Sequence, residues 1–228
     1  MHLGIAAVGK PNGAANPFII PNESIAAEIG RYLRLPIPPW GIVLDGSSVP
    51  HFASLNFNLT GQTLPPIIPA QFCNVFPGQV GNLLVFDAYI ANSDRHANNL
   101  SADYSCNPTR FNVFDHSHCL LSATNPNGIA CLARAQQSLV IDGSIGGSRH
   151  CLIDNIDNDG LFLDALDRIE NIPDWYLDDI VDSAAAYGLA ADQTIEMKTF
   201  LKARRHTLRQ LISNGKGQFH AITNWSQL

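Results

Sequence analysis

Two acidic side chains and one amide lie close together in the middle of the chain, in the segments ANSDRHANNL (91–100) and FNVFDHSHCL (111–120). Asp94 and Asn99 have the D-x-x-x-x-N spacing with which a kinase catalytic loop places a base and a metal-binding amide. Asp115 supplies the second carboxylate that such a site requires, and we expect it inside a short apolar strand. The spacing therefore predicts phosphoryl transfer from a nucleotide.

Parts of this pattern also have simpler explanations. Asp94 and Arg95 alone could form a surface ion pair, which contributes about 0–1 kcal/mol. Imidazole and thiol groups in the same region suggest zinc chemistry, namely His96, His116, His118 and Cys119. No H-E-x-x-H or C-x-x-C pattern accompanies them, so a metal hydrolase is the weaker enzymatic alternative.

Two further motifs favour structural roles. NIDNDG (155–160) begins like a calcium-binding loop, but Leu166 stands where a Glu ligand is needed, so we interpret the segment as a helix-capping turn. The basic run KARRHTLR (202–209) lies on an amphipathic helix. It is typical of the solvated face of a packed helix, with contact to an acidic partner as the alternative.

The first 64 residues alternate between strand and helix patterns. HLGIAAVGK (2–10) is an apolar run that ends in Lys10 before a cluster of turn residues, as a strand does. A helix capped by Asn22 is expected next, because apolar residues recur every four positions from Ile25 to Leu33 and prolines follow. WGIVLDG and HFASLNFNL then flank a DGSS turn, which predicts a hairpin.

The pattern changes at Phe76, and from about Leu161 onward helical patterns dominate. GQVGNLLVFDAYIAN (78–92) is apolar on nearly all sides and predicts a buried helix that leads into the acidic motif. RFNVFDH (110–116) predicts a short strand, and residues 122–151 read as loops that line a site. Together the patterns predict an α+β fold of two lobes, a reduced β-rich N-lobe (1–64) and a mainly α-helical C-lobe (65–228) that carries the catalytic and metal-binding loops.

Composition narrows the classes of protein that this chain can represent. Apolar residues make up 46% and charged residues 15% of the 228 residues, as in a folded globular protein. The formal charge of −6 argues against a broad surface for nucleic-acid backbones. Five scattered cysteines without a C-x-x-C pair, and the lack of an apolar run long enough for a membrane span, predict a cytoplasmic protein without a membrane partner.

The motif Asn92-x-Asp94-Arg95-His96-x-x-Asn99, followed by VFDH, resembles that of the HipA-like kinases and, more distantly, the D-R-H-x-x-N segment of lipid kinases. The likeness extends to VGKPNG and PNESIAAEIGRYLRLPIPP, which are similar to the strand lysine and following helix of that family. FLKARRHTLRQLI is similar to its C-terminal helix. A protein-kinase-like fold is what this resemblance implies.

The resemblance also implies roles for individual residues. Asp94 would be the catalytic base. Asn99 and Asp115 would complete the catalytic group as the ligands of Mg²⁺. Lys10 would bind the nucleotide phosphates, with Glu23 as its partner on the helix. The alternative partner is Glu28 on the same helix, while the Arg and His that follow the base would fix the loop through hydrogen bonds.

By the same resemblance, the chain is expected to be an ATP- and Mg²⁺-dependent kinase that phosphorylates Ser or Thr of a protein substrate. Members of the family include toxins of toxin–antitoxin pairs, which suggests an antitoxin-like partner. One departure matters: only nine residues precede Lys10, and Gly4 is the single glycine among the first eight, so a Gly-rich loop is missing. Either the first hairpin is absent, or a complementary lobe completes the kinase, or the protein is a pseudokinase or nucleotide-sensing module. A small-molecule phosphotransferase is a further alternative, because the acidic and amide groups do not specify the phosphate acceptor.

Overall fold

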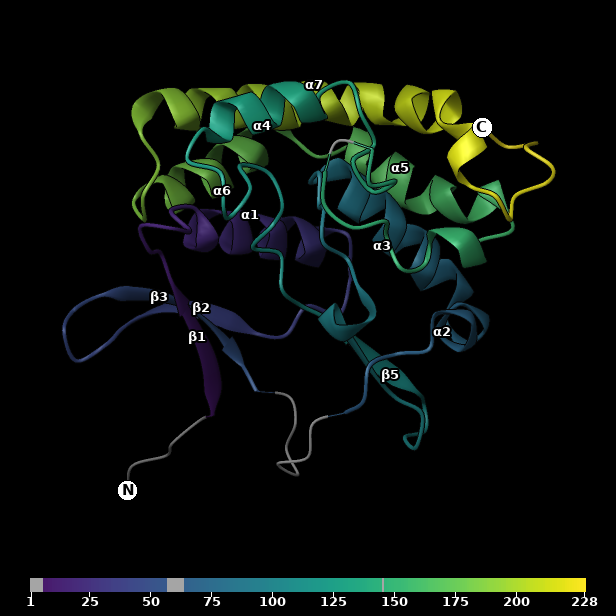
Figure 1. The fold of residues 1–228 in the computed structure, drawn as a ribbon, viewed down its shortest axis with the longest axis horizontal. Helices are drawn as coiled ribbons and strands as arrows, with labels where there is room; N and C mark the ends of the chain where they lie inside the picture. Colours follow the sequence, from purple (N-terminus) through teal and green to yellow (C-terminus); the bar gives the residue numbers. More distant parts are fainter. Residues whose placement is uncertain (1–5, 57–63, 145) are drawn as a thin grey trace.

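The computed structural model describes residues 6–56, 64–144 and 146–228. Its strands are β1 (Ala7–Pro11), β2 (Trp40–Leu44), β3 (Pro50–Leu55), β4 (Leu100–Asp103) and β5 (Arg110–Val113). Its α-helices are α1 (Ile19–Tyr32), α2 (Pro69–Val75), α3 (Pro77–Tyr89), α4 (Gly128–Ala135), α5 (Leu163–Glu170), α6 (Asp174–Ala185) and α7 (Ala191–Asn214). Figure 1 shows the first sheet below α1, with α6, α7 and α4 above.

A three-stranded antiparallel sheet in the order β1-β3-β2 forms the N-terminal part of the fold. The predicted hairpin is present as β2 and β3, although residues 57–59 of its second run lie outside the described ranges. Residues 2–5 of the predicted strand that ends at Lys10 lie outside them as well. Lys10 is opposite Phe52, which is opposite Ile42 on the next strand. Because paired residues share a face of a sheet, Lys10 lies on the same face as these two apolar side chains.

Helix α1 packs on this sheet, and it begins earlier than the sequence predicts. The expected cap, Asn22, lies inside the helix, and its buried side chain donates to Ser117 O (2.8 Å) and accepts from Leu121 N (3.3 Å). Asn12 performs part of the capping instead, because its Oδ1 accepts from Ile20 N at 2.9 Å. The prediction was wrong because the amide of Asn22 finds tertiary partners that local spacing does not reveal.

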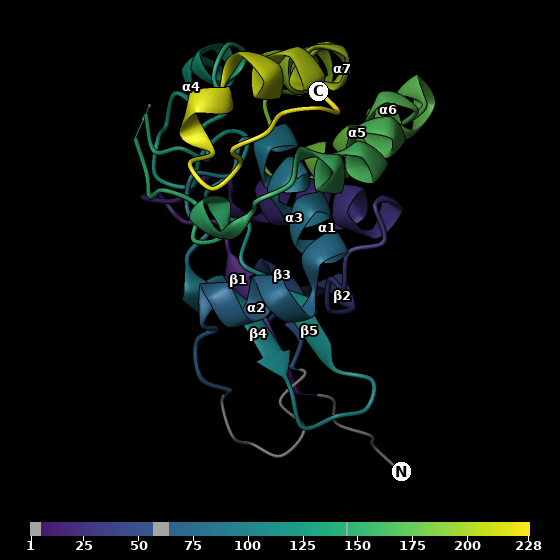
Figure 2. The same ribbon diagram turned by 90° about the vertical axis from the view of Figure 1, so that its right-hand side faces the viewer.

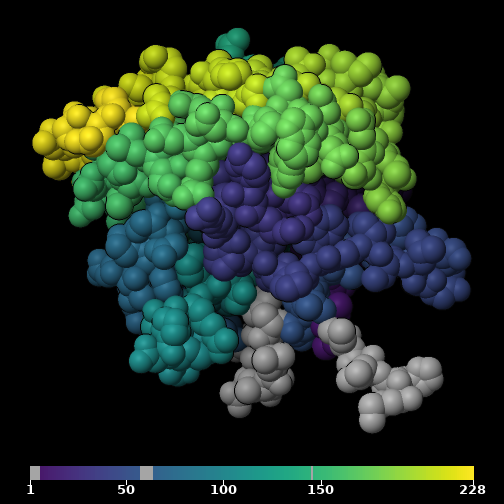
Figure 3. Space-filling model, turned by 180° about the vertical axis from the view of Figure 1, so that it is seen from behind, coloured from purple at the N-terminus to yellow at the C-terminus, as the bar shows by residue number. Residues whose placement is uncertain are grey.

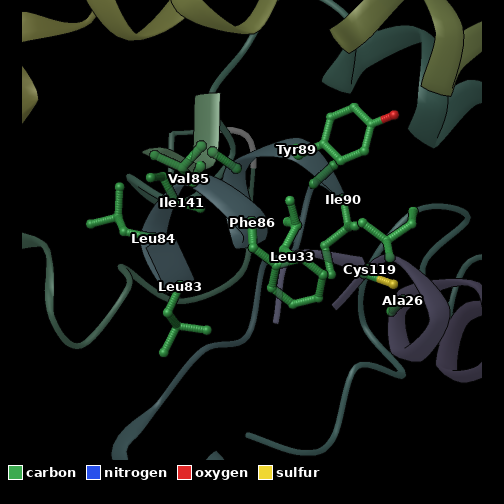
Figure 4. Close-up of a cluster of buried hydrophobic side chains, with 14 of the residues drawn as sticks. Ala26, Leu33, Leu83, Leu84, Val85, Phe86, Tyr89, Ile90, Cys119 and Ile141 are labelled. Carbon is green, nitrogen blue, oxygen red and sulfur yellow. The ribbon is translucent and has the colours of Figure 1, made fainter. Parts of the chain in front are cut away.

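The core is built around α3, the buried helix that the sequence predicts between residues 78 and 92. Its side chains from Leu83 to Tyr89 are inaccessible to solvent, and Figure 4 shows Phe86 beside Leu33 of α1 and Val85 beside Ile141. Gly81 lies against the backbone of Leu161, where an added Cβ would be 2.2 Å from the carbonyl oxygen. The close approach of α3 to the Leu161 segment therefore requires a glycine at position 81.

Helices α4, α5, α6 and α7 form a layer on the far side of α1 and α3, while α2 and the two small sheets lie on the opposite side (Figure 2). The sequence predicts loops throughout residues 122–151, and this is wrong in part, because Gly128–Ala135 forms helix α4, which packs against α7. The Asn127 side chain caps this helix by accepting from Ala130 N at 3.1 Å. No helix in the described part of the chain has the length and apolarity needed to cross a membrane.

The basic run 202–209 on α7 packs against the rest of the protein and is less solvated than the sequence predicts. Arg204 is fully buried and donates to carbonyl oxygens of Ala88, Ala135 and Ser138. Burial lowers the pKa of Arg204 to about 10. Other cations of α7 pair with acids of α5 and α6, as Arg209 does with Glu170 at 2.8 Å. The acidic partner of this basic segment is thus the same chain.

Candidate active site

Lys10 stands between two carboxylates that are far apart in the sequence. Its Nζ is 2.7 Å from Glu23 Oε1 on α1 and 2.7 Å from Asp115 Oδ1, which follows strand β5. Strand β1 carries the lysine on the face of the sheet that meets α1, so this side of the sheet, the helix and the β5 segment converge at one ammonium group. Such a cation can exchange a carboxylate for the phosphates of a nucleotide.

The partner of Lys10 on α1 is Glu23 and not Glu28. Glu23 is almost fully buried, and its second oxygen accepts from His116 N at 3.0 Å and lies 3.5 Å from His116 Nδ1. Glu28 faces the other side of the helix, where it pairs with Arg31 at 2.8 Å. Five residues on a helix rotate a side chain by about 140° from the first, which separates the two faces.

The three charges perturb one another. Burial favours the neutral form of Lys10, but Glu23 and Asp115 outweigh it and raise the pKa of Lys10 above 10.5. Burial likewise opposes ionisation of Glu23, yet His116 and Lys10 hold the pKa of Glu23 below 4.5. Against the same penalty of burial, Lys10 and Ser117 lower the pKa of Asp115 below 3.8. All three groups are therefore charged at neutral pH.

Asp94 and Asn99 lie on one loop that ends in a short 3₁₀ helix, Ala97–Asn99. Asn99 Nδ2 donates to the carbonyl oxygen of Asp94 at 2.9 Å, which links the two ends of the motif. Asn92 Oδ1 accepts from Asp94 N at 3.1 Å, and His96 Nδ1 accepts from Asn98 N at 3.2 Å. The loop is held by its own side chains, and the Asp94 side chain stays about one-third exposed (34%).

Arg95 fixes this loop to its surroundings. Its guanidinium is fully buried, donates to both carboxylate oxygens of Asp87 at 2.7 and 3.0 Å, and donates to Asn99 O at 3.0 Å. The same group donates to Phe114 O at 2.8 Å. One side chain therefore connects the backbone of the Asp94 loop to the residue that precedes Asp115.

Asp115 lies outside the strand in which the sequence placed it. Strand β5 ends at Val113, and Asp115 has a left-handed backbone with φ of 61°. This conformation is uncommon for residues other than glycine but is tolerated by Asp. The end of the ladder frees the chain to turn toward Lys10, and the Ser117 hydroxyl donates to Asp115 Oδ1 at 2.9 Å.

A cavity of about 440 Å³ opens beside the Lys10 cluster. Apolar side chains from the sheet, from the segment before β2 and from β4 and β5 form most of its wall, namely Val8, Ile37, Phe52, Leu100 and Val113. Lys10, Glu23 and Asp115 stand together at its polar side. Asp94 and Asn99 do not line this cavity, but their neighbour Asn98 does, so the loop borders it. An apolar pocket with a charged end suits a nucleotide.

The residues predicted to bind Mg²⁺ provide suitable ligand atoms. Asp115 offers a carboxylate and Asn99 an amide oxygen, which are the ligand types that this hard cation prefers. The Asn99 amide nitrogen is engaged with Asp94 O, so its oxygen is left as the group for a cation. Phe114 N donates to Asn99 O at 3.3 Å, which joins the two ligand segments through their backbones.

The zinc alternative has no geometric support. Within the described ranges, no three His, Cys, Asp or Glu side chains converge in a way that could hold a metal ion. Cys119 is buried with Sγ 3.6 Å from Asn22 O, and His116 packs edge-on against Phe86. The segment that resembles a calcium loop contains a capping turn, in which Asn158 Oδ1 accepts from Gly160 N at 2.8 Å.

Sequence reasoning missed two residues that support the site. Asp87 is the partner of Arg95, and His150 Nε2 lies 3.1 Å from Asp87 Oδ2. Asp87 had a visible signal, since it is the one acid in the otherwise apolar segment 78–92. His150 had none, because it lies 63 positions from Asp87 in a stretch without periodicity.

Comparison with known proteins concerns the fold. No family model matches the sequence, and no curated protein matches it. The crystal structure of the proinflammatory kinase CtkA of Helicobacter pylori is similar, with a TM-score of 0.62 and 13% identity over 94% of this chain and 89% of that one. HipA of Shewanella oneidensis MR-1, solved with HipB and operator DNA, has a TM-score of 0.48 and 14% identity over 91% of this chain and 60% of that one.

The chain therefore has the two-lobed fold of the kinases to which its motifs are similar. The predicted fold class is confirmed, and the resemblance to HipA-like kinases holds at the level of the fold. The predicted boundary between lobes after residue 64 stays a prediction. The TM-score of 0.62 shows a shared fold. Because the sequences are only 13% identical, the activity has to be argued from the site itself.

Proposed function

We propose that this protein is an ATP- and Mg²⁺-dependent kinase that transfers the γ-phosphoryl group to a hydroxyl group. The proposed acceptor is the side chain of Ser or Thr in a protein substrate. The observation that carries the proposal is the position of Lys10 between Glu23 and Asp115 at the charged end of an apolar cavity. The kinase-like fold supports the same class of reaction. The adenine ring would occupy the apolar part, and the phosphates would extend toward Lys10.

In this proposal the residues divide the chemistry between them. Asp94, about one-third exposed on the loop that borders the cavity through Asn98, would accept the proton of the attacking hydroxyl as the hydroxyl oxygen bonds to the γ-phosphorus and the bond to the β–γ bridging oxygen breaks. Asn99 and Asp115 would hold Mg²⁺, which supplies charge neutralisation on the phosphates. Lys10 would release Asp115 to the metal and bind phosphate oxygens while Glu23 keeps its position.

The test replaces the proposed base by its isosteric amide. Asp94→Asn should abolish transfer of labelled phosphate from ATP, with a loss of at least about 10²-fold, while thermal stability changes little. Asp103→Asn, on strand β4 and away from the cavity lining, is the matched control and should keep activity. Transfer that survives Asp94→Asn would refute the assignment. Protein, peptide and small alcohol acceptors assayed in parallel would distinguish a protein kinase from a small-molecule phosphotransferase.

A second candidate is a pseudokinase or nucleotide-sensing module. It is favoured by the edge position of β1, which pairs in the described part of the chain only with β3, so no described strand carries a Gly-rich loop beside Lys10. This candidate predicts that Mg²⁺–ATP raises the melting temperature of the protein without any transfer of phosphate. Activity that appears on addition of a partner that supplies the missing loop would favour a kinase completed by a complementary lobe. An antitoxin-like partner is proposed from the sequence resemblance alone.

A further inference from the structure

A second cavity, of about 450 Å³, lies against a different face of α1 from the proposed nucleotide site. It is bounded by α1, by β2 and by α6, and Figure 3 shows the face of the molecule on which α6 covers α1 above the β2–β3 hairpin. Glu23 lines the first cavity, and the next residue, Ser24, lines the second. The two cavities therefore border neighbouring faces of the same helix.

Three aromatic rings form the wall of this second cavity. Trp40 of β2 stacks on Phe52 with ring centroids 5.1 Å apart, and it faces Tyr176 and Tyr187 from the helical layer. Trp175 extends the aromatic surface beyond the cavity, because it contacts the Tyr176 ring edge-on at 5.8 Å and is 69% exposed. Trp and Tyr are the residues most enriched in the energetically dominant positions of protein interfaces.

The cavity also carries one carboxylate that no cation of the described residues neutralises. Helix α6 has four aspartates, and three of them form ion pairs with cations of α7, namely Asp174, Asp178 and Asp182. The fourth, Asp179, lines the cavity, and no cation of the described residues lies within ion-pair distance of it. Glu28 adds a second carboxylate from α1, held by the Tyr176 hydroxyl at 3.4 Å and by Arg31.

Aromatic faces together with carboxylates are the combination that binds organic cations. A guanidinium or ammonium over a Trp or Tyr ring within about 6 Å gains about 0.5–1 kcal/mol at an exposed site. Carboxylates at the same place add charge-assisted hydrogen bonds. An anionic or purely apolar ligand would gain nothing from Asp179. The second cavity thus differs chemically from the first, which contains the cation Lys10 beside Glu23 and Asp115.

We propose that this cavity binds an arginine or lysine side chain of a protein partner, with the exposed Trp175 as a further contact of the same interface. The inference goes beyond the proposed phosphoryl transfer and does not depend on it. Charge complementarity selects the partner: a basic segment would meet Asp179 and Glu28 in the cavity, and its backbone would lie across the aromatic surface. A partner bound there would contact the helix that carries Glu23.

The binding experiment uses the full chain labelled with 5-fluorotryptophan, which gives one ¹⁹F signal each for Trp40, Trp175 and Trp225. The probes are blocked tripeptides of alanine–arginine–alanine and alanine–citrulline–alanine, which differ by one charge. We expect the arginine peptide to shift the Trp40 signal with a Kd of about 1–10 mM. Trp225 packs on Phe219 at the C-terminus and should not move. The citrulline peptide should bind at least about fivefold more weakly.

Variants test whether the cavity is responsible. Glu28→Gln combined with Asp179→Asn should weaken the arginine peptide at least about fivefold, and Asp182→Asn combined with Glu196→Gln removes the same charge outside the cavity and should not. Ser183→Phe fills the cavity from an exposed position without a change of charge and should also abolish binding. No shift at about 10 mM peptide, equal binding of citrulline, or equal loss in both double variants would overturn the proposal.

Discussion

Arg95 and Asp87 form a buried ion pair with two hydrogen bonds, Nε to Oδ2 at 2.7 Å and Nη2 to Oδ1 at 3.0 Å, and neither side chain is accessible to solvent. Asn92 donates to Asp87 Oδ1 at 2.8 Å, and His150 Nε2 lies 3.1 Å from Asp87 Oδ2. Burial lowers the pKa of His150, which keeps this imidazole neutral at pH 7. The pair is the anchor through which α3 holds the loop of the proposed base.

Removal of the carboxylate from this pair should be costly. Asp87→Ala leaves the buried guanidinium of Arg95 without its counter-charge, and such a change costs about 3–5 kcal/mol of unfolding free energy. Asp182→Ala, which breaks the exposed pair with Lys198, should cost about 0–1 kcal/mol. Guanidinium unfolding of the two variants measures the contrast. Equally small losses of unfolding free energy in the two variants would show that the pair of Arg95 with Asp87 does not stabilise the fold.

The parts of the site that could be predicted from the sequence are those with local signals. Lys10 at the end of an apolar run, the D-x-x-x-x-N spacing and the acid within VFDH all depend on neighbours in the chain. What could not be predicted is set by contacts between distant segments. The choice of Glu23 over Glu28 follows from where α1 turns on the sheet, and the position of Asp115 follows from where the β4–β5 ladder ends.

The same distinction applies to the fold. The periodic segments gave the hairpin and the buried α3, because regular patterns specify regular elements. Helix α4 was missed since its eight residues lie in a region rich in Gly, Asn and Ser. The burial of Arg204 was missed as well, because its three carbonyl acceptors belong to α3 and to the end of α4 and the turn after it, which no local pattern connects to α7.

The pH dependence of stability should reveal the Lys10 cluster. The folded pKa of Glu23 is lowered, so its stabilising contribution is complete above its ordinary pKa of 4.5 and is lost as the pH falls toward the folded value. Glu23→Gln should destabilise the protein by about 1–3 kcal/mol at pH 7. Urea unfolding between pH 7 and 3 should show the difference from the native protein narrowing on acidification. Parallel curves would mean that the Glu23 charge does not stabilise the fold.

Removal of the Lys10 charge should raise the affinity of the site for a divalent cation and lower its affinity for a nucleotide. Lys10→Met removes a positive charge 2.7 Å from Asp115, so the site should bind Mn²⁺ without nucleotide at least about tenfold more tightly. The same variant should bind Mg²⁺–ATP at least about tenfold more weakly, because the phosphates lose their cation. Lys216→Met, near Trp225, is the control and should change neither. Electron paramagnetic resonance for Mn²⁺ and calorimetry for ATP provide the two affinities, and a parallel change in both would contradict the arrangement.

The C-terminal segment should depend on a single buried acid. Asp159 Oδ2 accepts the backbone N–H groups of Ser226, Gln227 and Leu228 at 3.0, 2.7 and 3.1 Å. Since hydrogen bonds to a charged acceptor are stronger than neutral ones, Asp159→Ala should cost about 2 kcal/mol. It should also speed hydrogen exchange of these amides at least about tenfold. Asp45→Ala removes a carboxylate that accepts two backbone N–H groups in the β2–β3 turn, and it should leave exchange at the C-terminus unchanged. Protection of residues 226–228 that survives Asp159→Ala would show that other contacts hold the segment, such as the packing of Trp225 and the hydrogen bond from Lys216 Nζ to Leu228 O.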